Sequence, residues 1–422
     1  MTSRLAWSLP VLLCLMLSTN SAVGAEDAES TIWKAVTLED GSAAPGLQLQ
    51  RAGKHVYAFE MDSEDAVIYL LEDGVAKEVK TADGSALKGN PFTAVPVGDQ
   101  LIIAGPGNAL QLVTGIKAEP LLKKNGNAVT IESSSVNKFR RRPEQHDGPY
   151  IMMSWGLCYV DGNQLLDAEQ IDKKDSSGGY FMAGTYVHCT GRNKESSCWY
   201  WDKGKAKRIK GLERPDAGFT QIGDFLQSSA GPLYYFNGKK AQEVKIDTTG
   251  ALNLGYRLDD SWLSFVSDGR GFHAFELHSG KASAWKPFKD MPPADYMGWS
   301  CGAHIVLAGT GGDSHVYKAT LKDVQEIKLP EGVSFRPRPD PTTPPAAVGA
   351  GQCVALRVEN AQSDSTILFI GKDNVPHLLP TGNEGKVRLD PRMPFEADET
   401  GIYATGINTK ARGYITLYAA CE

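Results

Sequence analysis

Short apolar runs closed by turn residues recur along this chain, and this recurrence restricts its possible folds more than any other feature of the sequence. One such run, 67–71, ends at Glu72-Asp73-Gly74, and another, 233–236, ends at Asn237-Gly238. β-Branched and aromatic runs of this length that end in Asp-Gly or Asn-Gly are typical of hairpin strands. The apolar residues after position 25 show almost no helical periodicity. The sequence therefore predicts an all-β fold.

The glycines that close comparable strands follow one another at a nearly constant period. The series is Gly74, Gly115, Gly162, Gly204, Gly238, Gly280 and Gly371, with a less clear unit near Asp323. It advances 297 residues over seven steps, about 42 residues each. Four-stranded blades of a β-propeller repeat about every 40–50 residues. We therefore predict a single β-propeller of about eight four-stranded blades, with a range of seven to nine.

The two ends of the repeat region indicate how such a ring closes. The last unit, 395–421, holds about three strands, and the run 31–36 can supply the missing one. Closure by this N-terminal strand removes an exposed edge and ties down both ends.

A proline-rich stretch, 330–345, divides the repeat. Two β-sandwich domains on either side of it are the competing arrangement, but the even spacing of strands argues against them. Proline breaks the hydrogen-bond ladder of a central strand, so we interpret 330–345 as an extended loop between two blades.

Residues 265–280 read F-V-S-D-G-R-G-F-H-A-F-E-L-H-S-G. This run resembles the bacterial propeller repeat with the consensus F-x-A-D-D-G-x-x-G-x-E-L-W-x-x-D-G-T. It departs at His278 and Ser279-Gly280, where the consensus has tryptophan and the closing Asp-Gly-Thr. The resemblance covers one unit, implies the propeller fold and carries no catalytic residue with it.

The first 25 residues have the pattern of a secretory signal. Arg4 supplies the positively charged N-terminal region, residues 5–17 are mostly apolar, and small residues at 21–25 offer a cleavage site. The apolar run is shorter than the roughly 20 residues that span a bilayer, and no later run in the sequence reaches that length. We expect a signal peptide at 1–25, a propeller domain at 26–422, and a secreted or periplasmic protein without a transmembrane segment in the mature chain.

Six cysteines follow the signal peptide, and an even number favours disulfides in an exported protein. They are Cys158, Cys189, Cys198, Cys301, Cys353 and Cys421. Cys189 and Cys198 flank the turn of a predicted hairpin, which predicts a bridge between them. Cys301 and Cys353 precede comparable strands of neighbouring units, which predicts a second bridge near the axis. Cys158 and Cys421 have no assigned partner.

Other motifs do not define a catalytic centre. Residues 298–302 match the Gly-x-Ser-x-Gly motif of α/β-hydrolases, in which a helix follows the serine. A strand-like run, 303–308, follows here instead, so Ser300 lacks the context of a nucleophile. The histidines are scattered, and the acidic clusters lack the spacing of a calcium loop. We predict no catalytic residue, no metal site and no cofactor.

Two basic segments stand out on a chain whose formal net charge is −6. Residues 203–210 have the pattern of an outer edge strand with its charges outward, and a surface for an anionic partner is the alternative. The loop 138–146 interrupts the repeat and carries Arg140, Arg141 and Arg142. Arginine donates two parallel hydrogen bonds to a carboxylate or phosphate, so these three predict an anion or partner site. Pairing with nearby acids is the alternative.

The mild acidity of the whole chain gives no support for nucleic-acid binding, which is usually the task of strongly basic domains. We therefore expect an exported propeller that serves as a binding or scaffold module for an extracytoplasmic protein or glycan. The alternative is a hydrolase or lyase that acts on extracytoplasmic glycans, which needs two carboxylates facing each other across a cleft.

Overall fold

The computed structural model describes most of the chain after residue 31. The described residues are 32–61, 65–131, 148–153, 155–171, 176–190, 197–213, 219–228, 232–250, 252, 255–294, 296–309, 315–335, 346–359, 365–379, 387–389, 393, 395–408 and 413–421. In this part of the chain the secondary structure is β-strand with three short 3-10 helices: η2 (Pro91–Thr93), η3 (Pro106–Asn108) and η6 (Lys286–Asp290). No helix in these ranges has the length and apolar character needed to cross a membrane.

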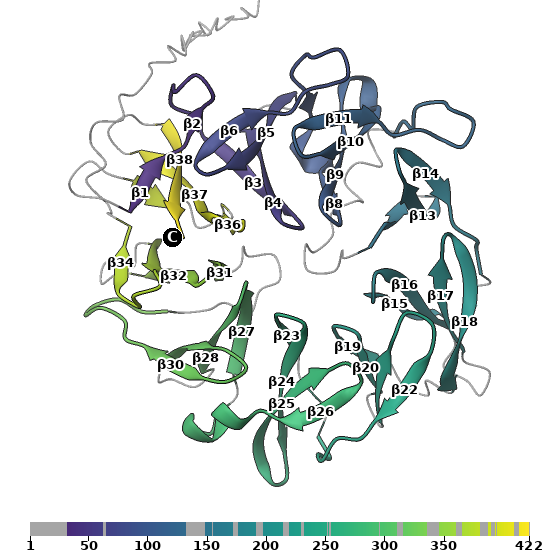
Figure 1. Ribbon diagram of the computed structural model, residues 1–422, viewed down its shortest axis with the longest axis vertical. Helices are drawn as coiled ribbons and strands as arrows, with labels where there is room; N and C mark the ends of the chain where they lie inside the picture. Colours follow the sequence, from purple (N-terminus) through teal and green to yellow (C-terminus); the bar gives the residue numbers. More distant parts are fainter. Residues whose placement is uncertain are drawn as a thin grey trace, which may run out of the picture.

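Within these residues the strands form nine sheets arranged as blades around a ring (Figure 1). A β-propeller is therefore confirmed, and nine blades lie at the upper end of the predicted range. The first blades contain β3 (Leu47–Ala52), β4 (His55–Glu60), β5 (Ala66–Glu72) and β6 (Val75–Glu78) in blade 1; β8 (Val95–Val97), β9 (Gln100–Ala104), β10 (Leu110–Thr114) and β11 (Lys117–Pro120) in blade 2; and β12 (Tyr150–Met153), β13 (Gly156–Asp161) and β14 (Gln164–Asp167) in blade 3.

The next three blades each have four antiparallel strands. They contain β15 (Ser176–Met182), β16 (Thr185–Thr190), β17 (Ser197–Asp202) and β18 (Lys205–Glu213) in blade 4; β19 (Phe219–Ile222), β20 (Phe225–Ser228), β21 (Leu233–Phe236) and β22 (Ala241–Val244) in blade 5; and β23 (Gly255–Leu258), β24 (Ser261–Asp268), β25 (Gly271–His278) and β26 (Lys281–Ala284) in blade 6.

The last three blades bring the chain back to its start. They contain β27 (Tyr296–Cys301), β28 (His304–Gly309), β29 (Val316–Ala319) and β30 (Val324–Ile327) in blade 7; β31 (Ala347–Ala350), β32 (Cys353–Glu359), β33 (Ser365–Ile370) and β34 (Pro376–Leu378) in blade 8; and β35 (Val387–Leu389), β36 (Phe395–Ala397), β37 (Gly401–Asn408), β38 (Gly413–Ala420) and β1 (Trp33–Ala35) in blade 9. β1 pairs antiparallel with β38, with Trp33 opposite Ala419.

The core lies between neighbouring blades, and this explains why the middle strands are apolar along their whole length. The four central residues of β28 are buried, as are the last four of β9, because both faces of each sheet pack against another blade. Between blades 6 and 7, the ring of Phe265 packs against that of Tyr296 at a centroid distance of 5.8 Å. Trp285 belongs to the same cluster, so these aromatic side chains serve as core.

A hairpin that links consecutive blades recurs at the start of the ring. Its turn glycines, Gly41, Gly84 and Gly126, have φ angles of +82°, +83° and +84°. In each copy an Asp or Asn one residue earlier accepts a hydrogen bond from a backbone N–H two residues on, as in Ser85 N to Asp83 Oδ1 at 3.1 Å. Such Asx turns stabilise tight reversals of the chain.

The same hairpins carry the chain from one blade to the next. The first contains β2 (Thr37–Leu38), which pairs in parallel with β6 of blade 1. Equivalent parallel bridges join Lys80 to Lys117 and Leu122 to Gln164. Another short strand, β7 (Lys88–Gly89), adds to β5. Each outer strand in this part of the ring is therefore fixed to the next blade by backbone hydrogen bonds as well as by packing.

The proline-rich segment connects blade 7 to blade 8, since β30 ends at Ile327 and β31 begins at Ala347. Ser334 N–H donates to the carbonyl of Glu359 in blade 8 at 2.8 Å. Phe335 beside it is buried, with its ring 5.4 Å from that of Trp299 in blade 7. Residues 336–345 lie outside the described part of the chain.

Candidate anion-binding groove

The sequence contains two basic segments, and the structure describes one of them. Arg140, Arg141 and Arg142 lie outside the described residues. Ser300 stands on β27, opposite Ile305, and the next element is strand β28 rather than a helix. In the described ranges no three His, Cys, Asp or Glu side chains gather as a metal site would require. The segment 203–210 remains, and it lies along blade 4.

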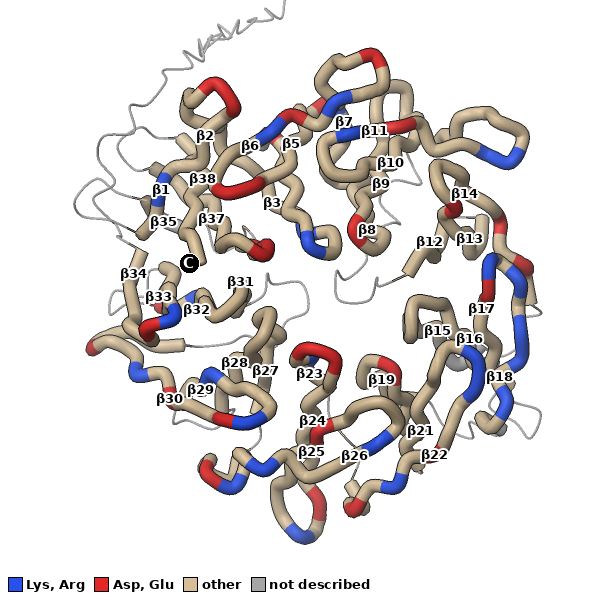
Figure 2. The backbone as a smooth tube through the Cα atoms, in the orientation of Figure 1, with Lys and Arg blue, Asp and Glu red and all other residues tan. Residues whose placement is uncertain are grey.

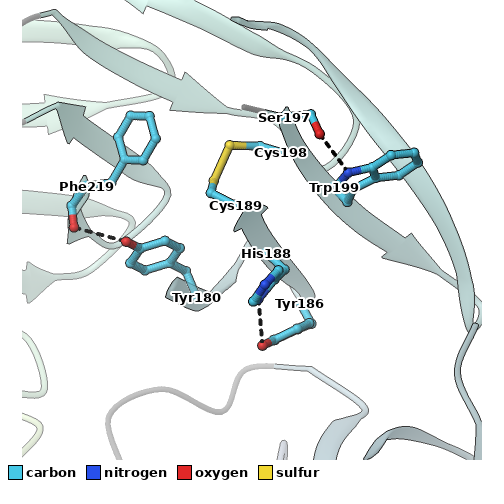
Figure 3. Close-up of a disulfide and its surroundings, with 8 residues drawn as sticks. All are labelled: Tyr180, Tyr186, His188, Cys189, Ser197, Cys198, Trp199 and Phe219. Carbon is cyan, nitrogen blue, oxygen red and sulfur yellow. Dashed lines mark hydrogen bonds between the residues drawn. A yellow bond between two sulfur atoms is a disulfide. The ribbon is translucent and has the colours of Figure 1, made fainter. Parts of the chain in front are cut away.

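A disulfide fixes the hairpin that carries this segment. Cys189 on β16 and Cys198 on β17 are directly opposite in the register, are joined by a disulfide, and have Cα atoms 4.1 Å apart (Figure 3). Both residues are fully buried in a cluster between blades 4 and 5. The Tyr180 hydroxyl donates to the carbonyl of Phe219 at 3.1 Å, which joins blade 4 to the first strand of blade 5.

The other predicted bridge has not formed in the structure. Cys301 and Cys353 are both free thiols, and both are buried. The thiol that contacts Cys353 is that of Cys421, which follows β38. Cys158 is a buried free thiol on β13.

The outermost strand of blade 4, β18, is irregular beside the disulfide. Its register with β17 shifts between Ser197 and Trp199, so four residues of β18 lie opposite Cys198. Within this bulge Ile209 and Leu212 are 1% and 3% exposed and pack toward blade 5, which leaves Lys210 exposed between them. A bulge commonly redirects side chains at a sheet edge, and here it turns basic side chains toward blade 5.

Blade 5 supplies the opposite wall. Lys210 and Lys240 form a parallel backbone bridge. Gly211 has a φ of +86°, and a Cβ at this position would lie 2.5 Å from the carbonyl oxygen of Ala241. Asn237 Oδ1 accepts hydrogen bonds from the N–H groups of Lys239 and Lys240, at 3.2 and 3.1 Å. This turn places the two lysines next to β18.

The result is a groove of about 640 Å³ between the outer strands of blades 4 and 5. Its lining residues are Tyr200, Lys207, Arg208, Lys210, Asn237, Lys239 and Lys240, five of which are cations. Lys and Arg run along this side of the ring at β18 (Figure 2). We call this feature the basic groove.

The cations of the basic groove are largely uncompensated. Lys207 forms an ion pair with Asp202, and the hydrogen bond that Lys207 donates to Asp202 raises the pKa of Lys207. Among the described residues, no carboxylate is within ion-pair distance of Arg208, Lys210, Lys239 or Lys240. On an acidic protein, this concentration of positive charge makes the groove a site of attraction for anions.

Two other charged positions have structural explanations. Asp268, at the turn between β24 and β25, accepts hydrogen bonds from Arg270 N at 2.8 Å and from Thr248 Oγ1 at 2.8 Å, and its Oδ1 lies 3.2 Å from His273 Nε2. These donors lower the pKa of Asp268, and they hold the turn. Burial raises the pKa of Glu396 on β36 to about 7, and among the described residues the charge of Arg51 opposes this shift. No second carboxylate contributes, so the described residues do not pair Glu396 as a glycosidase would require.

Sequence reasoning identified one wall of the basic groove and missed the other. Asn237, Lys239 and Lys240 stand about 30 residues after β18 along the chain. The signal that could have joined them was the repeat itself, because outer strands of consecutive units lie side by side in a propeller.

No family model matches the chain, and no curated protein matches it. Among solved structures, one prolyl endopeptidase is 11% identical with a TM-score of 0.40, covering 86% of this chain and 55% of its own. This chain thus spans about half of that enzyme.

Two further solved structures are comparably distant. The β-propeller domain of the trilobed protease from Pyrococcus furiosus is 9% identical, with a TM-score of 0.35 and coverage of 89% of this chain and 96% of its own. TolB from Acinetobacter baumannii is 10% identical, with a TM-score of 0.26 and coverage of 77% and 78%. Such distant likeness gives no information on function.

Proposed function

We propose that this protein is an exported binding module whose basic groove holds an acidic segment of a partner protein. The observation that carries the proposal is the convergence of five cations from two blades in one groove of a net-negative chain. The apolar faces of the blades are occupied by packing against each other, so outer surfaces and loops remain for recognition.

The position of the groove favours a polypeptide over a glycan. β18 is the outermost strand of blade 4: one edge pairs with β17, and in the described residues its other edge meets blade 5 at the Lys210–Lys240 bridge. An extended acidic segment can hydrogen-bond to such an edge and direct alternate carboxylates toward the lysines. An aromatic platform for stacking sugars is missing from the lining, since Tyr200 is 7% exposed.

The energetics predict salt-sensitive binding. An exposed ion pair contributes about 0–1 kcal/mol, so four or five pairs together contribute a few kcal/mol. Screening shortens the range of such attraction to about 10 Å at 0.1 M salt. We expect binding that weakens steeply between low and physiological ionic strength.

The test reverses three groove charges that have no ion-pair partner among the described residues. The variant Arg208→Glu, Lys210→Glu, Lys240→Glu should lose at least about tenfold in affinity for a fluorescein-labelled poly-glutamate peptide at low salt, measured by anisotropy. The matched control is Lys117→Glu, Lys123→Glu, Lys124→Glu, which makes the same charge change at exposed lysines of blade 2.

Equal losses in the two triple variants would show a general charge effect and refute the groove as the site. A parallel titration with polygalacturonate separates the two kinds of partner. If the groove binds the polymer and does not bind the peptide, the partner is an anionic glycan rather than a polypeptide.

Export is part of the proposal. The signal-like residues 1–25 support it, and so does the buried disulfide, since disulfides persist in oxidising compartments. Fractionation of bacteria expressing the full chain should place a form lacking about 25 residues outside the cytoplasm. A full-length cytoplasmic form with reduced Cys189 and Cys198 would contradict export.

We also propose that the pairing of β1 with β38 closes the ring. Support comes from the register of Trp33 with Ala419 and from Trp33 itself, which is 1% exposed in the cluster between blades 8 and 9. The ring of Trp33 meets that of Phe369 in blade 8 at 5.9 Å.

A further inference from the structure

We propose that Cys353 and Cys421 are a site of disulfide formation that links the last strand of blade 9 to blade 8. This inference is independent of the basic groove and of what the groove binds.

The placement of the two cysteines comes from the packing of blade 9 on blade 8. Cys353 is the first residue of β32, and Cys421 directly follows β38. Cys353 is 2% exposed within the hydrophobic cluster between these blades, and Cys421 packs against that cluster. Cys421 N–H donates to the carbonyl of Thr400 at 2.9 Å, which fixes the backbone beyond β38. The two thiols are hydrogen-bonded to each other.

A buried ammonium group adjoins the pair. Lys318 on β29 is 8% exposed, and its Nζ donates to the carbonyl of Gln352 at 2.6 Å and to Asn374 Oδ1 at 3.3 Å. The hydrogen bond from Cys421 and then the charge of Lys318 lower the pKa of Cys353, while Cys421, as the donor, has a raised pKa. A thiolate is the attacking species in disulfide exchange. Lys318 is held at the carbonyl of Gln352, next to Cys353, by blades 7 and 8 alone, so we assign the attack to Cys353.

The other two free thiols have no hydrogen bond to a cysteine among the described residues. Burial raises the pKa of Cys158 to about 12 and that of Cys301 to about 12. A raised pKa leaves less of the reactive thiolate. The structure therefore favours Cys421 over Cys301 as the partner of Cys353.

The reaction is an exchange with a disulfide donor, such as a dithiol oxidase or oxidised glutathione, before blade 9 packs fully on blade 8. The Cys353 thiolate attacks one sulfur of the donor disulfide, and the other donor sulfur leaves as a thiolate. Cys421 then loses its proton and attacks Cys353 Sγ, which releases the second donor thiolate. The two cysteines lose two protons and two electrons, and the donor gains them as two thiols.

Peptide mapping of the exported full chain tests the proposal. Alkylation under denaturing conditions without reductant should label Cys158 and Cys301 only, and digestion should yield a peptide pair joined through Cys353 and Cys421. In Cys353→Ser, Cys421 should become open to alkylation. Cys301→Ser is the matched control, and it should leave the Cys353–Cys421 link intact.

Labelling of both Cys353 and Cys421 in the oxidised, exported protein would overturn the proposal, as would a link between Cys301 and Cys353. If the variants fail to fold, the map of the unmodified chain decides by itself. We also expect the melting temperature of Cys421→Ser to fall by about 5 °C, because the lost cross-link closes a long loop.

Discussion

Glu396 shows how burial in the fold changes the titration of a single side chain. It lies on β36 opposite Tyr403 of β37, and burial raises its pKa to about 7 from a usual value of 4.5, with Arg51 acting in the opposite direction. The folded protein therefore holds this proton more tightly than the unfolded chain. Its contribution to stability is fully present below pH 4.5 and is lost as the pH rises to about 7.

Glu396→Gln removes this titration, because the amide stays neutral at every pH. We expect the variant to gain stability relative to the native protein as the pH rises from about 4.5 to about 7, by about 1 kcal/mol, since the residue keeps part of its solvent exposure. Urea unfolding at three pH values measures the gain, and the exposed Glu399→Gln is the control. A gain that is the same at all three pH values would contradict the assignment.

At the scale of the element, the linking hairpins explain how the blades keep a constant spacing. Gly41, Gly84 and Gly126 are 43 and 42 positions apart, which matches the overall period. Each occupies a left-handed backbone conformation that costs other L-residues about 1–2 kcal/mol. Space is not the constraint at Gly84, because a Cβ there would contact nothing within 4 Å.

Gly84→Ala should therefore destabilise the protein by about 1 kcal/mol through backbone strain alone. Gly269→Ala is the control, since a Cβ there also meets nothing within 4 Å and its φ lies outside the left-handed region. Denaturant unfolding of both variants should separate them. Equal stability of the two would show that the turn tolerates alanine.

Particular residues show which parts of the architecture can be inferred from the sequence. Strand runs and turn glycines predict a propeller, because blade strands are local hairpins. The predicted count of about eight was one short of the nine that the structure describes: blade 3 has three strands in the described residues, and the unit near Asp323 lacks a clear turn glycine. Cys189 and Cys198 belong to one hairpin, so their pairing can be predicted from the sequence. The basic groove and the Cys353–Cys421 contact join different blades, so local patterns do not reveal them.

At the scale of the whole molecule, blade 9 contains both the first described strand, β1, and the last, β38, which pair with each other. Trp33 is the largest fully buried side chain of β1. It packs on blade 8 through Phe369 and stands opposite Ala419 of β38. Its loss would leave a cavity between β1 and blade 8.

Trp33→Ala should cost about 3–5 kcal/mol, as truncation of a buried tryptophan does. Trp155→Ala is the matched control, because Trp155 is 50% exposed and should cost less than about 1 kcal/mol. Thermal unfolding followed by near-UV circular dichroism measures both. Similar unfolding midpoints for the two variants would show that β1 does not contribute to the closure of the ring.

The pairing of β1 with β38 also has a consequence for the time course of folding. Leu47 N–H donates to Thr416 Oγ1 across 369 positions of the chain, so blade 9 cannot form until nearly all of the described chain has been synthesised. Contacts so distant in sequence form slowly, and β1 remains an unpaired strand during that interval. Blades 1 to 8 can assemble in order from local hairpins, whereas the joining of β1 to β38 is the late step. The newly made chain is therefore most exposed to aggregation just before β1 and β38 meet.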